Sequence, residues 1–235
     1  MPKPIIKLVI PARNEAGAIG KVVTSVVRHV DQVIVADNGS TDDTARIAQD
    51  SGAITVSVAE PGYGRACLAA IKAAGDYDIL VFMDGDASDD PSDLPELLKP
   101  LIAREADMVI GSRILGSCDK GALTVQQRFG NSLACWLMHV FWGFRFTDLG
   151  PFRAITRQAY DQLNMQAPTF GWTVEMQVRA LKLGLRCREV PVHYRARIGV
   201  SKISGTVKGV IMAGLYILGT IFKEALQGRK GMVSK

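Results

Sequence analysis

The sequence predicts an α/β protein built on a mostly parallel sheet with helices on both faces. Short runs rich in Val and Ile recur along the first half of the chain and alternate with segments of helical periodicity, as in parallel sheets. Polar and glycine-containing motifs follow these runs directly, and in such sheets ligands bind beyond the carboxyl ends of the strands. The 235 residues are 48% hydrophobic and 22% charged, so the chain can bury a substantial core.

Five apolar runs are predicted to be buried strands, because each is short and dominated by β-branched or other apolar residues. They span residues 5–10, 32–36, 54–58, 79–83 and 108–110. Each of the first four is followed by a segment with helical features. The order therefore predicts repeated strand–helix units and not a hairpin sheet.

Helices are predicted between the strands from their spacing and end signals. In residues 19–30 the apolar side chains recur every three or four positions, and this periodicity outweighs the strand propensity of the valines. A second helix is expected to start near Ser40 or Thr41, whose hydroxyls can cap it. A third spans about 65–74 and ends at Gly75, and a fourth starts at 90–91 with Pro91 in its first turn.

The C-terminal part differs in charge from the rest of the chain. The last 50 residues carry ten Lys and Arg but only two Glu, which is typical of an ordinary solvated basic tail or of a segment that meets an anionic partner, either a membrane surface or a nucleic acid. The apolar run 209–222 has 14 residues, fewer than the ~20 that span a bilayer. We divide the chain into a main domain, 1–204, and a C-terminal helix with a basic tail, 205–235. The helix is either packed on the core or amphipathic and interfacial.

Cysteine usage and the N-terminus favour a cytoplasmic protein, attached peripherally if the C-terminal helix is interfacial. The four cysteines lie far apart without a CxxC pair, so neither a zinc site nor a disulfide framework is indicated. The chain starts almost directly with an apolar strand, and no secretory signal is recognisable. His139 and the aromatic residues of 136–146 are expected in the core, and the alternative for the aromatic residues is a groove for a lipid chain.

Motifs with ligand-binding chemistry follow the first four predicted strands. They are Pro11-Ala12-Arg13-Asn14-Glu15, Asp37-Asn38-Gly39-Ser40, Glu60-Pro61-Gly62-Tyr63-Gly64-Arg65 and Asp84-Gly85-Asp86. Each motif alone is common in turns. Four in succession at strand ends indicate one binding site, because these ends meet at one edge of the sheet.

The residue types suit a nucleotide diphosphate held with a divalent cation. Asp84 and Asp86 offer the carboxylate oxygens that Mg²⁺ or Mn²⁺ prefers, and Gly85 permits close backbone approach. Asp37 is placed to bind a base or ribose. Gly62 and Gly64 allow backbone N–H groups to approach phosphate, and Arg65 can neutralise it.

The four motifs together resemble glycosyltransferase family 2, which has the Rossmann-like GT-A fold, and most closely its polyprenyl (dolichol) phosphate sugar synthase branch. The resemblance covers nearly the whole chain. Its later segments are Gly111-Ser112-Arg113, Arg128, Asp148-Leu149-Gly150-Pro151-Phe152-Arg153, Phe170-Gly171-Trp172 with Glu175, Glu189-Val190-Pro191-Val192, and Arg195 through Lys202.

The resemblance implies inverting, metal-dependent transfer of a sugar from a UDP- or GDP-sugar to an acceptor, with polyprenyl phosphate as the expected acceptor. It implies that the first motif and Asp37 bind the nucleotide, and that Asp84 and Asp86 bind the metal and the sugar diphosphate. Ser88 stands where related synthases often carry a further metal ligand. The cations implied for the acceptor phosphate or the diphosphate are Arg113, Arg128, Arg197 and Lys202.

Three alternatives remain open at this point. A hydroxyl acceptor would require a general base, for which Asp148 is the candidate, although Asp148 could instead orient a neighbouring arginine. A nucleotidyltransferase would also use a metal and carboxylates, but a Gly-rich loop with a lysine usually follows its first strand. A nucleic-acid-binding module would explain the basic tail but not the four motifs.

Overall fold

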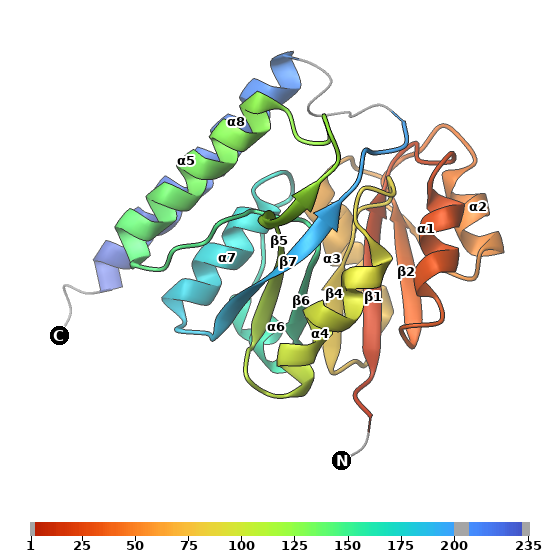
Figure 1. Ribbon diagram of the computed structural model, residues 1–235, viewed down its shortest axis with the longest axis horizontal. Helices are drawn as coiled ribbons and strands as arrows, with labels where there is room; N and C mark the ends of the chain where they lie inside the picture. The colour runs from red at the N-terminus through yellow and green to blue at the C-terminus, as the bar shows by residue number, and fades with distance from the viewer. Residues whose placement is uncertain (1–2, 200–206, 232–235) are drawn as a thin grey trace.

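The computed structural model describes residues 3–199 and 207–231, and these form one seven-stranded sheet with helices on both faces (Figure 1). The strand order is β3-β2-β1-β4-β6-β5-β7, and only β6 runs antiparallel to its neighbours. The predicted mostly parallel α/β architecture is confirmed. The strands are β1 Ile6–Ala12, β2 Gln32–Asp37, β3 Ile54–Ser57, β4 Ile79–Phe82, β5 Met108–Cys118, β6 Arg153–Thr156 and β7 Cys187–Tyr194.

The helices divide between the two faces of the sheet, and each face has its own apolar core. The first core joins the sheet to α1, α2 and α4, and the second joins it to α3, α5, α6 and α7. A short 3₁₀ turn, Pro91–Asp93, precedes α4. The helices are α1 Ile19–Val26, α2 Thr44–Asp50, α3 Tyr63–Ala74, α4 Leu94–Ile102, α5 Val125–Trp142, α6 Arg157–Leu163, α7 Trp172–Lys182 and α8 Val207–Gly231.

The predicted elements of the first half all form, but three of their bounds differ clearly. Helix α2 begins at Thr44, later than expected and without a side-chain cap, and strand β5 extends beyond the predicted run to Cys118. Helix α1 ends at Val26, four residues earlier than predicted, because the chain turns there and the amide of His29 bonds to the carbonyl of Val26. Val30 remains buried and completes the apolar stripe from outside the helix. The apolar periodicity thus continued beyond the helix that it predicted.

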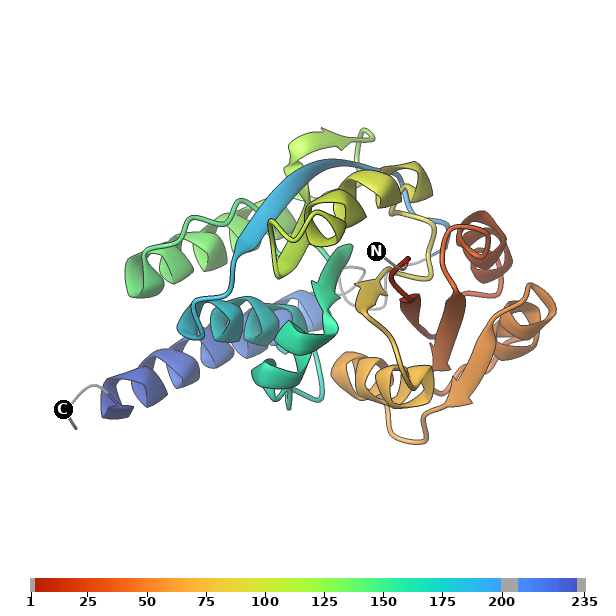
Figure 2. The ribbon, with the colours of Figure 1, turned by 90° about the horizontal axis from the view of Figure 1, so that it is seen from below.

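Helices α5 and α8 lie side by side at the end of the molecule opposite α1 and α2 (Figures 1 and 2). On α8, Ile221 and Glu224 are buried, and Glu224 pairs with Arg179 and Lys182 of α7. The opposite side of α8 is exposed, so this helix is partly packed on the domain. No helix in the described part of the chain is both long and apolar enough to cross a bilayer.

The aromatic residues around α5 are not all in the core, contrary to the expectation. Phe146 is buried, but Trp136 is 58% exposed and Phe141 is 40% exposed. His139, expected to be a core residue, is exposed as well. An apolar segment that also faces solvent cannot be distinguished from a buried one by composition alone.

Candidate active site

The loops that follow β1 and β2 are tied to each other by side-chain hydrogen bonds. The Asn14 side chain accepts from the amide of Thr41 at 2.7 Å, and the amide of Asn14 donates to the Ser40 hydroxyl at 2.9 Å. The amide of Glu15 donates to the Thr44 hydroxyl at 2.8 Å. The first two motifs therefore form one rigid wall at the carboxyl end of the sheet.

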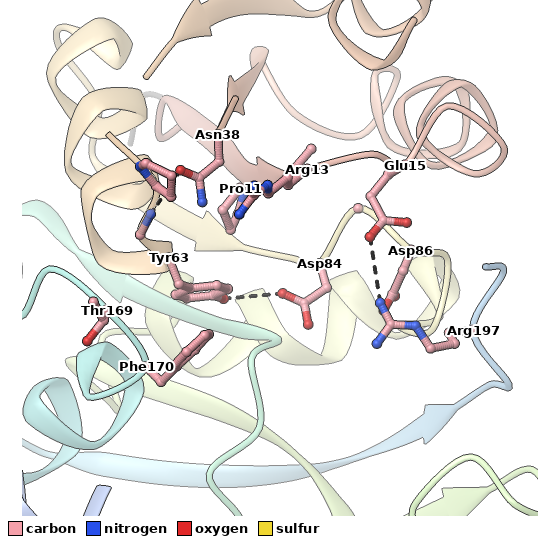
Figure 3. Close-up of a pocket in the computed structure, with 14 residues that line it drawn as sticks. Pro11, Arg13, Glu15, Asn38, Tyr63, Asp84, Asp86, Thr169, Phe170 and Arg197 are labelled. Carbon is pink, nitrogen blue, oxygen red and sulfur yellow. Dashed lines mark hydrogen bonds and ion pairs between the residues drawn. The ribbon is translucent and has the colours of Figure 1, made fainter. Parts of the chain in front are cut away.

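A cavity of about 370 Å³ lies against this wall at the carboxyl ends of β1 and β4 (Figure 3). We call it the first cavity. Thr169 and Phe170, which lie between α6 and α7, close one side of it, and Arg197, which follows β7, closes another. Its lining residues are Pro11, Ala12, Arg13, Glu15, Asn38, Pro61, Gly62, Tyr63, Asp84, Gly85, Asp86, Thr169, Phe170 and Arg197.

The Asp-Gly-Asp motif is held in place by the residues that follow it. Asp86 is 3% exposed, and both the amide and the hydroxyl of Ser88 donate to its Oδ1. Asp89 accepts from the amide of Asp84 at 3.0 Å. Ala87, which follows Asp86, adopts a left-handed backbone with φ 63°. A non-glycine residue in this conformation is strained, and such strain concentrates at functional sites.

Electrostatics at the motif favour the arrival of a cation. Burial, together with the charge of neighbouring Asp86, raises the pKa of Asp84 to about 7. Burial and the charge of Asp84 also raise the pKa of Tyr63, so this phenol stays protonated and donates to Asp84 Oδ1 at 3.2 Å (Figure 3). Two adjacent buried carboxylates repel each other unless a positive charge joins them.

Arg197 supplies such a charge in this structure. Its guanidinium Nη2 lies 2.8 Å from Asp86 Oδ2 and 3.6 Å from Glu15 Oε1 (Figure 3). The segment after β7 is pinned to the motif, because the amides of Arg195 and Ile198 donate to the carbonyls of Ser88 and Asp86. Within the described residues, the buried Nε of Arg197 has no hydrogen-bond partner and can donate to an anionic ligand.

A divalent metal fits this donor set when a ligand completes it. Among the described residues, no group of three or more His, Cys, Asp and Glu side chains is arranged to hold an ion. Mg²⁺ is commonly bound by one or two carboxylates together with substrate phosphates and waters. Asp84 and Asp86 can serve in this way, with Ser88 as a support and not as a further charged ligand. The third carboxylate of the lining, Glu15, faces Arg197.

Other residues predicted for nucleotide-sugar binding lie outside the lining. Asp37 accepts from the amide of Ser40, and Asn38 lines the cavity in its place. Arg65 pairs with Glu60 at 3.2 Å and does not line the cavity. Gly64 does not line the cavity either, whereas Gly62 does, but its amide, expected to approach phosphate, donates to Asn38 Oδ1 at 3.0 Å.

The glycines of the third motif have a packing reason of their own. A Cβ on Gly62 or Gly64 would overlap the carbonyl oxygens of Pro168 and Ala167. These glycines therefore let the 167–170 segment approach the start of α3 closely. Gly85 is similarly confined, since its Cβ would lie 3.3 Å from Ile10 and 3.4 Å from Ala12.

A second cavity, of about 790 Å³, adjoins the first. Tyr63, Asp84, Phe170 and Arg197 line both cavities, so the two meet at the metal-binding motif. The rest of its wall is mainly apolar and comes from α5, α7, α8 and the segments before them. The remaining lining residues are Arg113, Val125, Gln126, Gln127, Phe129, Gly130, Asn131, Leu133, Leu149, Pro151, Thr173, Tyr194, Ala213, Gly214, Ile217 and Leu218.

Arg113 is fixed in the second cavity by a bidentate ion pair with Asp148. The Nε and Nη2 atoms of Arg113 each lie 2.7 Å from an oxygen of Asp148, whose side chain is fully buried. Asp148 also accepts from the amide of Arg113 at 2.8 Å, and the Tyr194 ring lies 5.0 Å from the guanidinium carbon. With its oxygens so engaged, Asp148 is placed to orient Arg113, the second of the two roles considered for it.

The loop that carries Asp148 is itself held from several sides. Glu189 accepts from the amides of Thr147 and Asp148 at about 3.0 Å, and Asn131 accepts from the amide of Leu149 at 2.8 Å. Arg153, fully buried, donates to carbonyls of this same segment. These contacts account for the polar residues of the later segments, which support Arg113 from outside the cavity.

One of the cations implied for phosphate binding lines neither cavity, and another cannot be placed. Arg128 is exposed on α5 and lines neither. Lys202 lies outside the described residues. Arg113 and Arg197, which come from segments more than 80 residues apart, are brought to the same cavity.

Tyr63, Asn38 and Phe170 contribute to the site although they were not among the predicted residues. Tyr63 and Asn38 lie inside the recognised motifs, so their position after a predicted strand could have identified them as site residues. Phe170 belongs to a later segment of the resemblance, but nothing local indicates that it closes a cavity. It is positioned by packing against Tyr216 of α8, with ring centroids 6.4 Å apart.

Comparison with known protein families agrees with this geometry. The family model described as "Glycosyl transferase family 2" matches residues 7–172. An uncharacterized glycosyltransferase of Mycobacterium tuberculosis is 33% identical over 211 residues, which are 88% of this chain and 94% of that protein. The undecaprenyl-phosphate mannosyltransferase of Micrococcus luteus is 31% identical over 218 residues, which are 85% of this chain and 87% of that protein.

A solved structure provides a further match over the whole domain. Glucosyl-3-phosphoglycerate synthase from Mycobacterium tuberculosis, in complex with Mn²⁺, UDP-glucose and phosphoglyceric acid, superposes with a TM-score of 0.77 and 26% identity. The match covers 94% of this chain and 80% of that one.

Proposed function

The chain belongs to glycosyltransferase family 2, and we propose that it transfers a sugar from a UDP- or GDP-sugar to a polyprenyl phosphate, with inversion, at a membrane surface. It is a hexosyltransferase with the GT-A fold, and this assignment argues against the nucleotidyltransferase alternative.

The proposed donor site is the first cavity. Pro11, Ala12, Arg13 and Asn38 form the wall against which we place the nucleoside, and Asp84 and Asp86 are the carboxylates that would hold Mg²⁺ or Mn²⁺. Such an ion, when bound, neutralises charge on the diphosphate leaving group. The solved relative bound to Mn²⁺ and UDP-glucose supports a metal and a nucleotide-sugar here.

The proposed acceptor site is the second cavity. We infer a phosphate acceptor from the charged residues that line this cavity. Among its described lining residues Asp84 is the only carboxylate, and Asp84 is already assigned to the metal. Arg113 and Arg197 are its cations. A hydroxyl acceptor needs a base at this position, whereas a phosphate oxygen is already a nucleophile and needs cations to hold it.

The proposed reaction follows from this arrangement. Arg113, fixed by Asp148, holds the acceptor phosphate, and one phosphate oxygen attacks the anomeric carbon from the second cavity. The bond from that carbon to the diphosphate breaks on the opposite side, and the nucleoside diphosphate leaves in the first cavity. Arg197 is placed to donate to the diphosphate, since its buried Nε has no other partner in the described structure.

Transfer assays with matched acceptors test this proposal. Purified protein with Mn²⁺ is given UDP-glucose or GDP-mannose and one of three acceptors: a ten-carbon isoprenyl phosphate, the corresponding isoprenyl alcohol, or 3-phosphoglycerate. We expect a phosphodiester product only from the isoprenyl phosphate. Transfer to the alcohol or to 3-phosphoglycerate, with none to the isoprenyl phosphate, would contradict the acceptor assignment and favour a hydroxyl acceptor.

A further inference from the structure

Exposed apolar side chains concentrate on the two helices that flank the second cavity. Of the 17 large hydrophobic residues that are exposed in the described structure, ten lie on α5 and α8. Monomeric soluble proteins rarely expose large contiguous apolar patches unless the patch binds something. The ten residues are Val125, Phe129, Trp136, Val140, Phe141, Met212, Leu215, Tyr216, Phe222 and Leu226.

On each helix these residues form a stripe directed away from the core. On α5, Val125, Phe129, Trp136 and Val140 are separated by four, seven and four positions, which places them on one side of a helix. The buried residues of α5, such as Met138, lie on its opposite side. The stripe is therefore not needed for packing within the domain.

The same arrangement recurs on α8. Met212, Leu215, Phe222 and Leu226 are separated by three, seven and four positions, opposite the buried Ile221 and Glu224. The ring of Phe141, which follows Val140 on α5, lies 5.9 Å from that of Phe222 in an edge-to-face contact, so exposed aromatic side chains of the two helices touch each other. We call the two stripes together the apolar face. Both helices lie at one end of the molecule (Figures 1 and 2).

The exposed charges on the described parts of these two helices are of one sign. Helix α5 contains no Asp or Glu, and the one acidic residue in the sequence of α8, Glu224, is buried and paired with Arg179 and Lys182. Arg128 and Lys223 are exposed on the two helices. A cationic helix pair with exposed Trp, Phe and Leu complements the headgroup region of a bilayer that contains anionic lipids.

The mouth of the second cavity lies on the same face. Val125 and Phe129 belong to the stripe on α5 and also line that cavity, and they are 79% and 70% exposed. We propose that the apolar face lies on the surface of an anionic bilayer, so that a lipid-anchored phosphate enters the second cavity directly from the membrane. This inference deepens the proposed function and rests on its lipid phosphate acceptor. In this orientation α5 and α8 lie in the interface without crossing the bilayer, which agrees with their hydropathy.

Vesicle flotation of the full chain tests whether the apolar face binds an anionic bilayer. The vesicles contain phosphatidylcholine alone or phosphatidylcholine with phosphatidylglycerol, and the variant Trp136→Ser/Val140→Ser replaces stripe residues that line neither cavity. The control variant, Ile102→Ser/Leu183→Ser, replaces equally apolar side chains that are 51% and 47% exposed elsewhere. A second stripe variant, Leu215→Ser/Leu226→Ser, guards against misfolding of the first.

We expect the wild type and the control to float with the anionic vesicles, and each stripe variant to bind them on the order of tenfold more weakly. All proteins should transfer sugar equally well to a water-soluble isoprenyl phosphate. The stripe variants should lose transfer to a long-chain polyprenyl phosphate embedded in vesicles.

The inference is overturned if the wild type does not float, or if the stripe variants float as well as it does. It is also overturned if the wild type is a dimer in solution and the stripe variants are monomers, because a second copy then covers the face. Failure of the proposed function gives a different result. The wild type would then float as expected and the stripe variants would not, but no isoprenyl phosphate, soluble or embedded, would accept sugar.

Discussion

The two cavities that meet at Asp84 are built by different parts of the chain and carry different charges. The first takes most of its wall from loops after β1, β2, β3 and β4, within the first 86 residues. The second is assembled from β5, α5, α7, α8 and the segments between them, and its cations, Arg113 and Arg197, are widely separated in sequence. The carboxylates of the first cavity come from the loops that directly follow strands β1 and β4. The arginines and the apolar wall of the second cavity come from segments that are far apart in sequence. This difference in charge is the reason why we propose the donor for the first cavity and the acceptor for the second.

The largest expected effect comes from the first cavity. Asp86→Asn keeps the shape of the side chain but removes the charge, and we expect transfer to fall by about a thousandfold or more, because the diphosphate loses its metal. The melting temperature of the ligand-free variant should stay close to that of the ligand-free wild type. Thermal shift on adding Mn²⁺ with UDP- or GDP-sugar should disappear in the variant.

Asp43→Asn is the matched control for this substitution. Asp43 is an exposed aspartate that pairs with Arg46 on the surface, at 2.9 Å. The Asp43→Asn variant should retain both sugar transfer and the metal-dependent thermal shift. Wild-type turnover by Asp86→Asn would show that the metal assignment is wrong.

An intermediate effect is expected in the second cavity and should leave the first unaffected. Arg113→Lys keeps the positive charge but cannot form the bidentate pair with Asp148, so the cation loses its fixed orientation. We expect the KM for the phosphate acceptor to rise about tenfold, while the affinity for the nucleotide-sugar, measured by calorimetry, stays unchanged.

Arg186→Lys provides the comparison for this prediction. Arg186 makes a similar bidentate pair with Asp107, but its side chain is 57% exposed and remote from both cavities. It should leave both kinetic constants unaltered. If Arg113→Lys weakens donor and acceptor equally, the separation of the two cavities by function does not hold.

The smallest effect is expected for Arg128→Ala. Because Arg128 is exposed on α5 and lines neither cavity, transfer to a water-soluble isoprenyl phosphate should stay within about twofold of the wild type. Steady-state kinetics with varied acceptor measure this directly. A large loss confined to the acceptor KM would instead support the phosphate-binding role that the family resemblance implies.

Sequence patterns predicted the first half of the fold and most of the first cavity. Each strand there is a continuous apolar run, and the residues directly after a parallel strand must emerge at the same edge of the sheet. Residues such as Glu15 and Asp84 could therefore be assigned to one site without knowledge of any contact. The exceptions, Asp37, Gly64 and Arg65, lie outside the lining, because strand-end position does not determine which way a side chain points or how closely another segment packs.

What the sequence alone determined is thus the α/β class and the Asp-Gly-Asp centre, because both depend on local order and on the geometry of parallel strands. The tertiary structure decided the rest. The antiparallel strand β6 has only four residues, too few to give a periodicity, and it is identified by its pairing with β4 and β5. The pair between Arg113 and Asp148 joins residues 35 positions apart, and the exposure of Trp136 depends on which side of α5 the domain covers. Contacts of this kind arise from packing between distant segments, which local periodicity does not encode.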